Sequence, residues 1–140
     1  MKLFKLQILI AFLSLPLMSC DNEIVPPASE KEIILKISRT WNCDLMEDDS
    51  PYGSFSIVIS NNTSSDAKIN ISNFHNSGET ITATVRKDLI INFDYSVGTQ
   101  VFKGNGEISN DYSKIDWTYT VENSDVTVNV TGTSTYGGAV

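Results

Sequence analysis

The chain contains few of the residues that build metal centres and nucleophilic active sites. Its 140 residues include one His and two Cys. Basic residues are also scarce, because 10 Lys and Arg face 17 Asp and Glu, a formal charge of -7. Phosphate recognition needs clustered basic side chains, so this balance argues against a nucleic-acid partner. We expect no metal, no cofactor and no enzymatic activity.

The composition is nevertheless that of a folded protein. Apolar residues make up 41% of the chain, charged residues 19% and aromatic residues 9%, which is enough to build a core and excludes a disordered tail. A length of 140 residues corresponds to one domain.

The one long apolar run, Leu6 to Leu17, is too short for a membrane-spanning helix, which needs about 20 residues. Lys2 and Lys5 precede it, as in the positive n-region of a secretory signal. We therefore predict that residues 1–19 are a signal peptide that is removed after export.

The end of this segment carries a short motif, Leu17, Met18, Ser19 and Cys20. It resembles the bacterial lipobox, in which a small residue precedes the Cys that is lipidated. The resemblance implies cleavage before Cys20 and attachment of a diacylglyceryl group to its sulfur, often with N-acylation, so that acyl chains such as palmitate hold the protein to the membrane. The alternative is an ordinary signal peptide whose Cys20 lies near the cut by chance. Loss of Lys2 and Lys5 makes the formal charge of the mature chain -9, so the acyl anchor and no basic patch would hold it.

Two acids stand among the three residues after Cys20, which are Asp21, Asn22 and Glu23, and they make this segment acidic. They resemble the export signal of surface lipoproteins in Bacteroidota, whereas in enteric bacteria Asp at this place resembles an inner-membrane retention signal. We expect a lipid-anchored protein of the cell envelope, at the outer membrane or cell surface in preference to the inner membrane. A plain solvated tether is the third interpretation.

We divide the mature chain into a lipidated N-terminus and tether, residues 20–31, and a folded domain, residues 32–140. Pro26 and Pro27 favour an extended tether. A short helix is predicted from Glu30 to Ser38, because Ile residues recur there at helical spacing and Ser29 with Glu32 has the pattern of a capping box.

Beyond Arg39 the apolar pattern changes to alternation, which is typical of β-strands. Eight strands are predicted, at residues 40–46, 54–61, 67–73, 80–85, 89–95, 99–109, 114–121 and 125–133. The connections are too short for parallel crossovers, so the fold class is all-β, with the strands as an eight-stranded antiparallel meander. Either a closed or nearly closed barrel or a two-sheet sandwich would satisfy this pattern, and we favour the barrel because closure removes both unpaired edges. Gly104 and Gly106 would let a strand bend sharply or let another backbone approach closely.

Several residues together resemble a known group: Trp41 opening the first strand, Asn73-Phe74 before Gly78, Gly104-Asn105-Gly106, and Tyr119-Thr120-Val121. The chain is similar, over about residues 38–136, to small Bacteroidota lipoproteins with a lipocalin-like, calycin-type β-barrel, mostly of unassigned function. The resemblance implies a barrel that can hold a ligand. True lipocalins have Gly two residues before the first-strand Trp, where this chain has Arg39.

The barrel interior is the main candidate site. The inward residues that could form a ligand pocket or fill the core are Trp41, Phe55, Ile57, Phe93, Phe102, Gly104, Gly106, Trp117 and Tyr119. An eight-stranded barrel is just wide enough to be filled by side chains or to hold one small ligand. The first functional hypothesis is a non-catalytic module that binds a small apolar or amphipathic ligand. The alternative is an interaction protein that contacts another envelope protein or a glycan through loops or a sheet face.

Other reactive residues are expected to be structural. His75 lies in an Asn-rich turn and is predicted to be exposed, and Cys43 alternates with apolar residues and is predicted to be buried and inert. The segment Glu47 to Asp49 is predicted to be a solvated acidic turn without a calcium site. Alternation places Asp116 and Trp117 on opposite faces, which counts against a sugar-cleaving site.

Overall fold

A computed structural model describes residues 27–136 of the protein. The predicted signal peptide, the lipobox residues Leu17 to Cys20 and most of the predicted tether lie outside the described residues. Within residues 27–136, no helix is long and apolar enough to cross a membrane.

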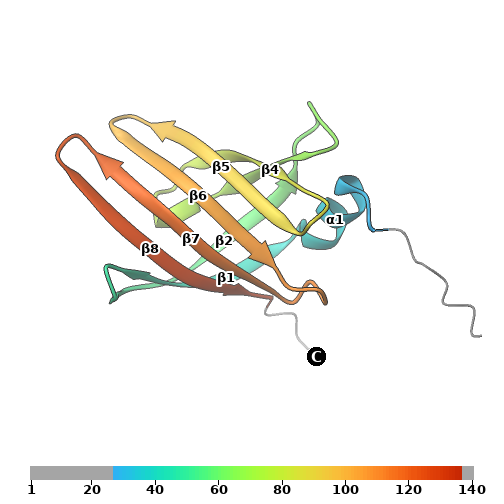
Figure 1. The fold of residues 1–140 in the computed structure, drawn as a ribbon, viewed down its shortest axis with the longest axis horizontal. Coiled ribbons are helices and arrows are strands. Elements are labelled where there is room, and N and C mark those ends of the chain that lie inside the picture. Colours follow the sequence, from blue (N-terminus) through green and yellow to red (C-terminus); the bar gives the residue numbers. More distant parts are fainter. Residues whose placement is uncertain (1–26, 137–140) are drawn as a thin grey trace, which may run out of the picture.

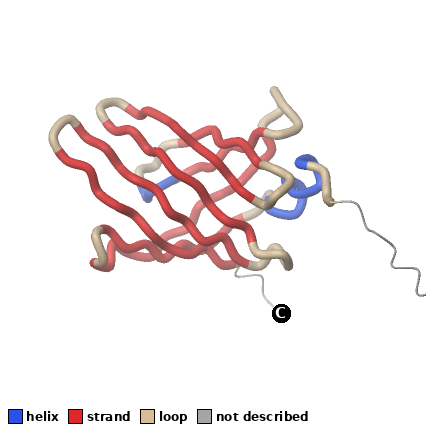
Figure 2. Tube along the Cα trace, in the orientation of Figure 1, coloured by secondary structure: helices blue, strands red, loops and turns tan. Residues whose placement is uncertain are grey.

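The described chain is a closed barrel of eight strands in sequence order, each antiparallel to its neighbours, with β8 paired to β1 (Figures 1 and 2). The elements are α1 (Glu30–Ile37), β1 (Thr40–Glu47), β2 (Ser50–Asn61), β3 (Lys68–Ser72), the 3-10 helix η1 (Phe74–Asn76), β4 (Thr80–Val85), β5 (Ile90–Val97), β6 (Gln100–Ile108), β7 (Lys114–Asn123) and β8 (Val126–Thr135). The predicted meander and barrel are confirmed, and the sandwich alternative is not what the chain forms.

The connection between β1 and β2 differs from the prediction. The predicted strands 40–46 and 54–61 leave residues 47–53 as their connection, but β2 already begins at Ser50 and only Asp48 and Asp49 remain between the strands. Both have left-handed backbones, with φ of 42° and 64°. Two-residue hairpin turns require such conformations, and Asp tolerates them better than most residues. Pro51 and Gly53 are residue types typical of a loop, but here both lie in β2 and are paired with Met46 and Leu45 of β1.

The predicted helix is confirmed and closes one end of the barrel, called here the helix end (Figure 1). The Ser29 hydroxyl accepts from the Glu32 amide at 3.3 Å, and the Glu32 carboxylate accepts from the Ser29 amide at 2.9 Å, which completes the capping box. Ile33, Ile34 and Ile37 are buried against the strands. The helix starts at Glu30, so the predicted tether boundary after residue 31 falls inside it.

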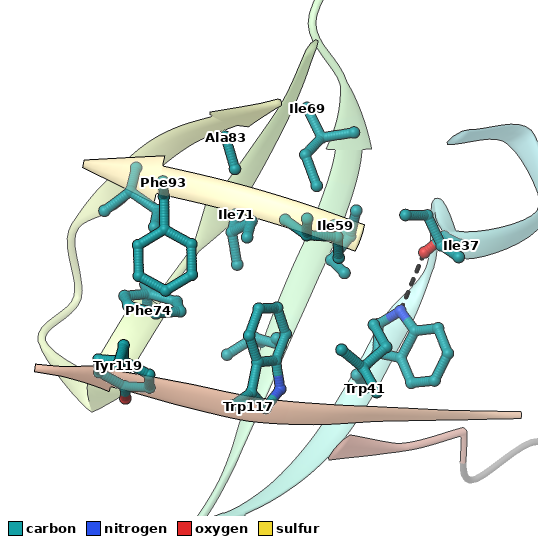
Figure 3. Close-up of a cluster of buried hydrophobic side chains, with 14 of the residues drawn as sticks. Ile37, Trp41, Ile59, Ile69, Ile71, Phe74, Ala83, Phe93, Trp117 and Tyr119 are labelled. Atoms are coloured by element: carbon teal, nitrogen blue, oxygen red, sulfur yellow. Dashed lines mark hydrogen bonds between the residues drawn. The ribbon is translucent and has the colours of Figure 1, made fainter. Parts of the chain in front are cut away.

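Trp41 and Arg39 join the helix to the barrel. The Trp41 indole donates to the Ile37 carbonyl at 2.9 Å (Figure 3). The Arg39 guanidinium carbon lies over the rings of Trp41 and Tyr136, 4.9 Å and 4.1 Å from their centroids. The guanidinium also donates to the Tyr112 carbonyl at 2.7 Å. Arg39, where lipocalins have Gly, therefore helps to seal this end.

The two glycines of β6 allow close packing against β7. A Cβ on Gly106 would lie 2.5 Å from Trp117 Cζ3, and one on Gly104 would collide with the backbone of Thr118 and Tyr119. The predicted close approach of another backbone is therefore present. The room that these glycines leave is occupied by Trp117 and Tyr119.

Candidate functional site

The opposite end of the barrel, called here the open end, is formed by the four turns β1–β2, β3–β4, β5–β6 and β7–β8. The turns β5–β6 and β7–β8 lie together at the side of the molecule away from α1 (Figure 1). The turn between β3 and β4 differs from the others because it turns inward: Phe74 and His75 of η1 are both buried. We call these two residues the plug.

The interior below the plug is filled. A cavity of about 10 Å³ remains, which is room for at most one water molecule. Its lining residues are Cys43, Leu45, Phe55, Ile57, Phe74, His75, Trp117 and Tyr119. Four of the predicted pocket residues, Phe55, Ile57, Trp117 and Tyr119, therefore meet there. Phe93 and Phe102 lie in contact with the plug, while Trp41 is at the helix end.

Phe74 is held by four aromatic rings, called here the cage. Its ring centroid lies 4.9 Å from that of Phe93, 5.1 Å from Tyr119, 5.7 Å from Phe102 and 5.9 Å from Trp117. Three of these contacts are edge-to-face, the geometry that aromatic pairs favour. Figure 3 shows the Phe74 ring among Phe93, Tyr119 and Trp117. The cage comes from three strands, whereas the ring inside it comes from a turn.

His75 is buried, so the predicted exposed turn histidine is wrong. The imidazole Nε2 lies 3.1 Å from a Glu47 carboxylate oxygen and Nδ1 lies 2.9 Å from the Tyr119 hydroxyl. Its ring stacks on Tyr52, with centroids 4.7 Å apart and planes at 20°. The prediction failed because the polar composition of the turn suggested solvent, whereas the backbone folds the His over the barrel. Glu47 likewise contacts His75 and does not belong to a purely solvated acidic turn.

The two hydrogen-bond partners of His75, Glu47 and Tyr119, define which imidazole nitrogen carries the proton. Burial lowers the His75 pKa below its ordinary 6.5, against the opposing influence of Glu47, so the imidazole is neutral at about pH 7. A carboxylate can only accept, so Nε2 carries the proton and donates to Glu47, and Nδ1 accepts from the Tyr119 hydroxyl. Burial also raises the pKa of Tyr119, which therefore stays protonated. The plug presents a neutral donor to a carboxylate.

The backbone of the plug is unusual. Asn73, His75 and Asn76 all have left-handed conformations, with φ between 53° and 57°. Asn adopts this region more readily than most residues, and Gly78 takes it at no steric cost. The Asn73 side chain donates to the Ser56 carbonyl at 2.8 Å and accepts from the Gly78 amide at 3.0 Å. A few polar contacts therefore hold the turn closed.

A second buried polar group lies deeper in the barrel. The Trp117 indole donates to the Ser134 hydroxyl at 2.7 Å, and the same hydroxyl contacts the Cys43 thiol. Cys43 is buried, as predicted, and this burial raises the pKa of its thiol to about 11, so the thiol is protonated at neutral pH. Asp116 lies on the outer face and contacts Lys114 and Thr133, so it does not meet Trp117 in a cleft, also as predicted.

All four cage residues, Phe93, Phe102, Trp117 and Tyr119, are among the predicted pocket residues. Four other residues of the site were not predicted: Phe74, His75, Glu47 and Tyr52. The signal for the plug was present in principle. An aromatic and a basic ring stand side by side in a turn bounded by Asn73, Asn76 and Gly78, which are residue types that permit left-handed backbones.

No family model and no curated protein matches the chain. Among solved structures, the chain is similar to EF1p2_mFAP2b bound to DFHBI, with a TM-score of 0.53 and 15% identity over 76% of this chain and 98% of the other. It is also similar to a redesigned β-barrel, with a TM-score of 0.50 and 14% identity over 74% and 94% of the two chains. A chain described as a candidate outer membrane protein from Bacteroides fragilis has a TM-score of 0.43 and 17% identity, over 74% and 52%. At these identities the first two matches support the barrel fold alone, and the third is too distant to carry an argument.

Proposed function

We propose that the protein is a lipid-anchored binding module of the cell envelope, whose barrel holds a small apolar or amphipathic ligand at its open end without catalysis. The cage is the binding site. In the structure it is occupied by Phe74, so the ligand enters when the plug swings out and takes the place of the Phe74 ring.

One observation carries this proposal: the ring that fills the cage belongs to a turn and not to a strand of the barrel. A core residue on a strand cannot leave without breaking the ladder on both sides. Phe74 instead belongs to a seven-residue connection between β3 and β4, so it can leave while those strands stay paired. Conformations populated at about 0.1 to 10% are sufficient for a ligand to select them.

The anchor is supported by the lipobox pattern that ends in Cys20. Replacing Cys20 with Ser should release the protein from the membrane fraction into the soluble envelope fraction. Retention of the Cys20→Ser protein in membranes would contradict lipid anchoring, and it would leave the binding proposal standing. Protease treatment of intact cells would then distinguish surface display from an inward-facing location.

The binding proposal is tested on protein purified from its host membranes. Native mass spectrometry should show a fraction of molecules that carries a bound mass. Asn73→Gly keeps the left-handed backbone but removes the two hydrogen bonds of the side chain, so it should increase the open population and with it the apparent affinity.

Asn76→Gly is the matched control, because it also relieves a left-handed residue but has an exposed side chain. The bound fraction should rise more in Asn73→Gly than in Asn76→Gly. A uniformly empty wild-type protein, together with an empty Asn73→Gly variant, would refute the proposal.

The interaction-protein hypothesis has less support. The exposed large apolar residues of the described chain include Leu35 on α1, Val58 on β2 and Val126 on β8, which belong to different elements. Such scattered side chains are normal on a protein surface.

A further inference from the structure

The plug itself indicates what kind of molecule would replace it. Phe74 places an aromatic ring in the cage, and the adjacent His75 places a nitrogen donor 3.1 Å from a Glu47 oxygen. The two side chains thus satisfy two kinds of group at once, an apolar cage and a carboxylate beside it. When the plug leaves, Glu47 and the Tyr119 hydroxyl lose their partner and need another.

The carboxylate is better suited to a cation than to the donor it now has. Burial lowers the His75 pKa, so Glu47 faces a neutral imidazole at about pH 7. An ammonium in the same place would donate a hydrogen bond as the imidazole does, and it would add the attraction between opposite charges that the neutral imidazole lacks. The ring of Tyr52, which is 40% exposed and stacked on His75, offers a further face to a cation in the same place.

The charge distribution of the barrel agrees with this assignment. The turns and strand ends of the open end, residues 47–50, 73–79, 97–100 and 122–126, contain six carboxylates and no Lys or Arg. These are Glu47, Asp48, Asp49, Glu79, Glu122 and Asp125. Basic residues such as Lys31, Lys36, Arg86 and Lys87 lie at the helix end. A mouth lined by one sign of charge attracts ligands of the opposite sign and repels anions.

We infer that the ligand is a small aromatic amine, with its ring in the cage in place of Phe74 and its ammonium against Glu47. This inference rests on the proposed function, because it needs the plug to open. It narrows the amphipathic class to cations and excludes fatty acids and other carboxylates, which the six acidic residues would repel.

The test uses three probes of matched shape: 2-phenylethylamine, which is a cation at neutral pH, the neutral 2-phenylethanol, and the anionic phenylacetate. Calorimetric titration of the host-purified full chain should give an affinity for the amine about tenfold or more above that for the alcohol, since both can donate to Glu47 but only the ammonium adds a charge–charge attraction to the partly buried carboxylate. Phenylacetate should bind most weakly.

Two variants separate direct contact from general attraction. Glu47→Gln keeps the shape and a hydrogen-bonding group but removes the charge, so the preference for amine over alcohol should disappear. Glu122→Gln removes an exposed carboxylate of the same end, so it should leave the preference within about twofold at physiological salt. The thermal midpoint of each variant shows whether it remains folded.

The outcomes separate this inference from the function it rests on. Equal affinity for the amine and the alcohol, or a preference that survives Glu47→Gln, would overturn the amine assignment and leave ligand binding intact. Failure of all three probes while the host-purified protein carries a neutral or anionic bound mass would do the same. Three results together would overturn both the amine assignment and ligand binding itself: none of the three probes binds, the host-purified protein carries no bound mass, and the plug amides exchange only through global unfolding.

Discussion

Replacement of Phe74 by Ala tests whether the plug opens separately from the barrel. Phe74 and Phe102 are a matched pair, because both are Phe and both are nearly fully buried, with exposed fractions of 3% and 1%. Their rings are in contact, with centroids 5.7 Å apart. Truncation of a core Phe to Ala typically costs about 3 to 5 kcal/mol. That range should apply to Phe102→Ala, because Phe102 lies within β6 and cannot leave the core without disrupting strand pairing.

Phe74→Ala should cost less, because the truncated protein has an alternative. The substitution destabilises only the closed state, and the open state is unaffected. The measured loss therefore cannot exceed the free energy of opening the plug, which is about 1.4 to 4 kcal/mol for open populations of 10 to 0.1%. If opening costs about 2 kcal/mol, Phe74→Ala loses about 2 kcal/mol of stability, roughly half the loss expected for Phe102→Ala.

Urea unfolding followed by far-ultraviolet circular dichroism measures the loss of stability in both variants. This signal does not rely on the fluorescence of Trp117, which belongs to the cage that the substitutions change. Native-state hydrogen exchange gives the opening free energy independently. The amides of Phe74 and Ser77, bonded to Glu79 and Phe74 carbonyls, should exchange through local opening, whereas the Val85 amide, bonded to Ala67, should exchange only through global unfolding. A loss for Phe74→Ala equal to or larger than that for Phe102→Ala, together with plug amides that exchange only through global unfolding, would show that the plug is an integral part of the core, and it would refute the gated site.

Three further predictions concern other residues. Because the folded pKa of His75 lies below its ordinary 6.5, the unfolded chain binds a proton that the folded protein does not, so stability should fall as pH drops from about 7 toward 5. The urea midpoint of His75→Asn should change much less over this range, and equal slopes would contradict the assignment. Cys43, with its pKa raised to about 11, should resist iodoacetamide at about pH 8 until the protein is unfolded in denaturant, as mass spectrometry can show; rapid labelling of the native protein would contradict the packed interior. Arg39→Lys should lose about 1 to 2 kcal/mol of unfolding free energy, nearly as much as Arg39→Ala, because Lys cannot reproduce the stacked planar guanidinium between Trp41 and Tyr136; full stability of Arg39→Lys would show that charge alone is enough.

The strands and the helix could be predicted because their signals are local. Alternation such as Ile81, Ala83 and Val85 against Thr80, Thr82 and Thr84 forces one face inward, since a one-residue slip would bury the hydroxyls. The short connections then require antiparallel neighbours, and Ser29 with Glu32 fixes the start of the helix. The β1–β2 turn was mistaken because its residues are compatible with either a loop or a strand end, and pairing with β1 decided between them.

The sequence by itself determined the strand order, the antiparallel pairing, the inward set that includes Trp117 and Tyr119, and the Cys20 motif that predicts an anchor. Only the tertiary structure decided what occupies the space inside. Whether a polar turn points outward or folds into a barrel mouth depends on left-handed backbone angles at Asn73, His75 and Asn76. It also depends on the two partners of His75, which are Glu47, 28 residues before it, and Tyr119, 44 residues after it. Such contacts leave no periodic trace in a sequence, because periodicity records which face of an element is buried and not which distant residue meets it.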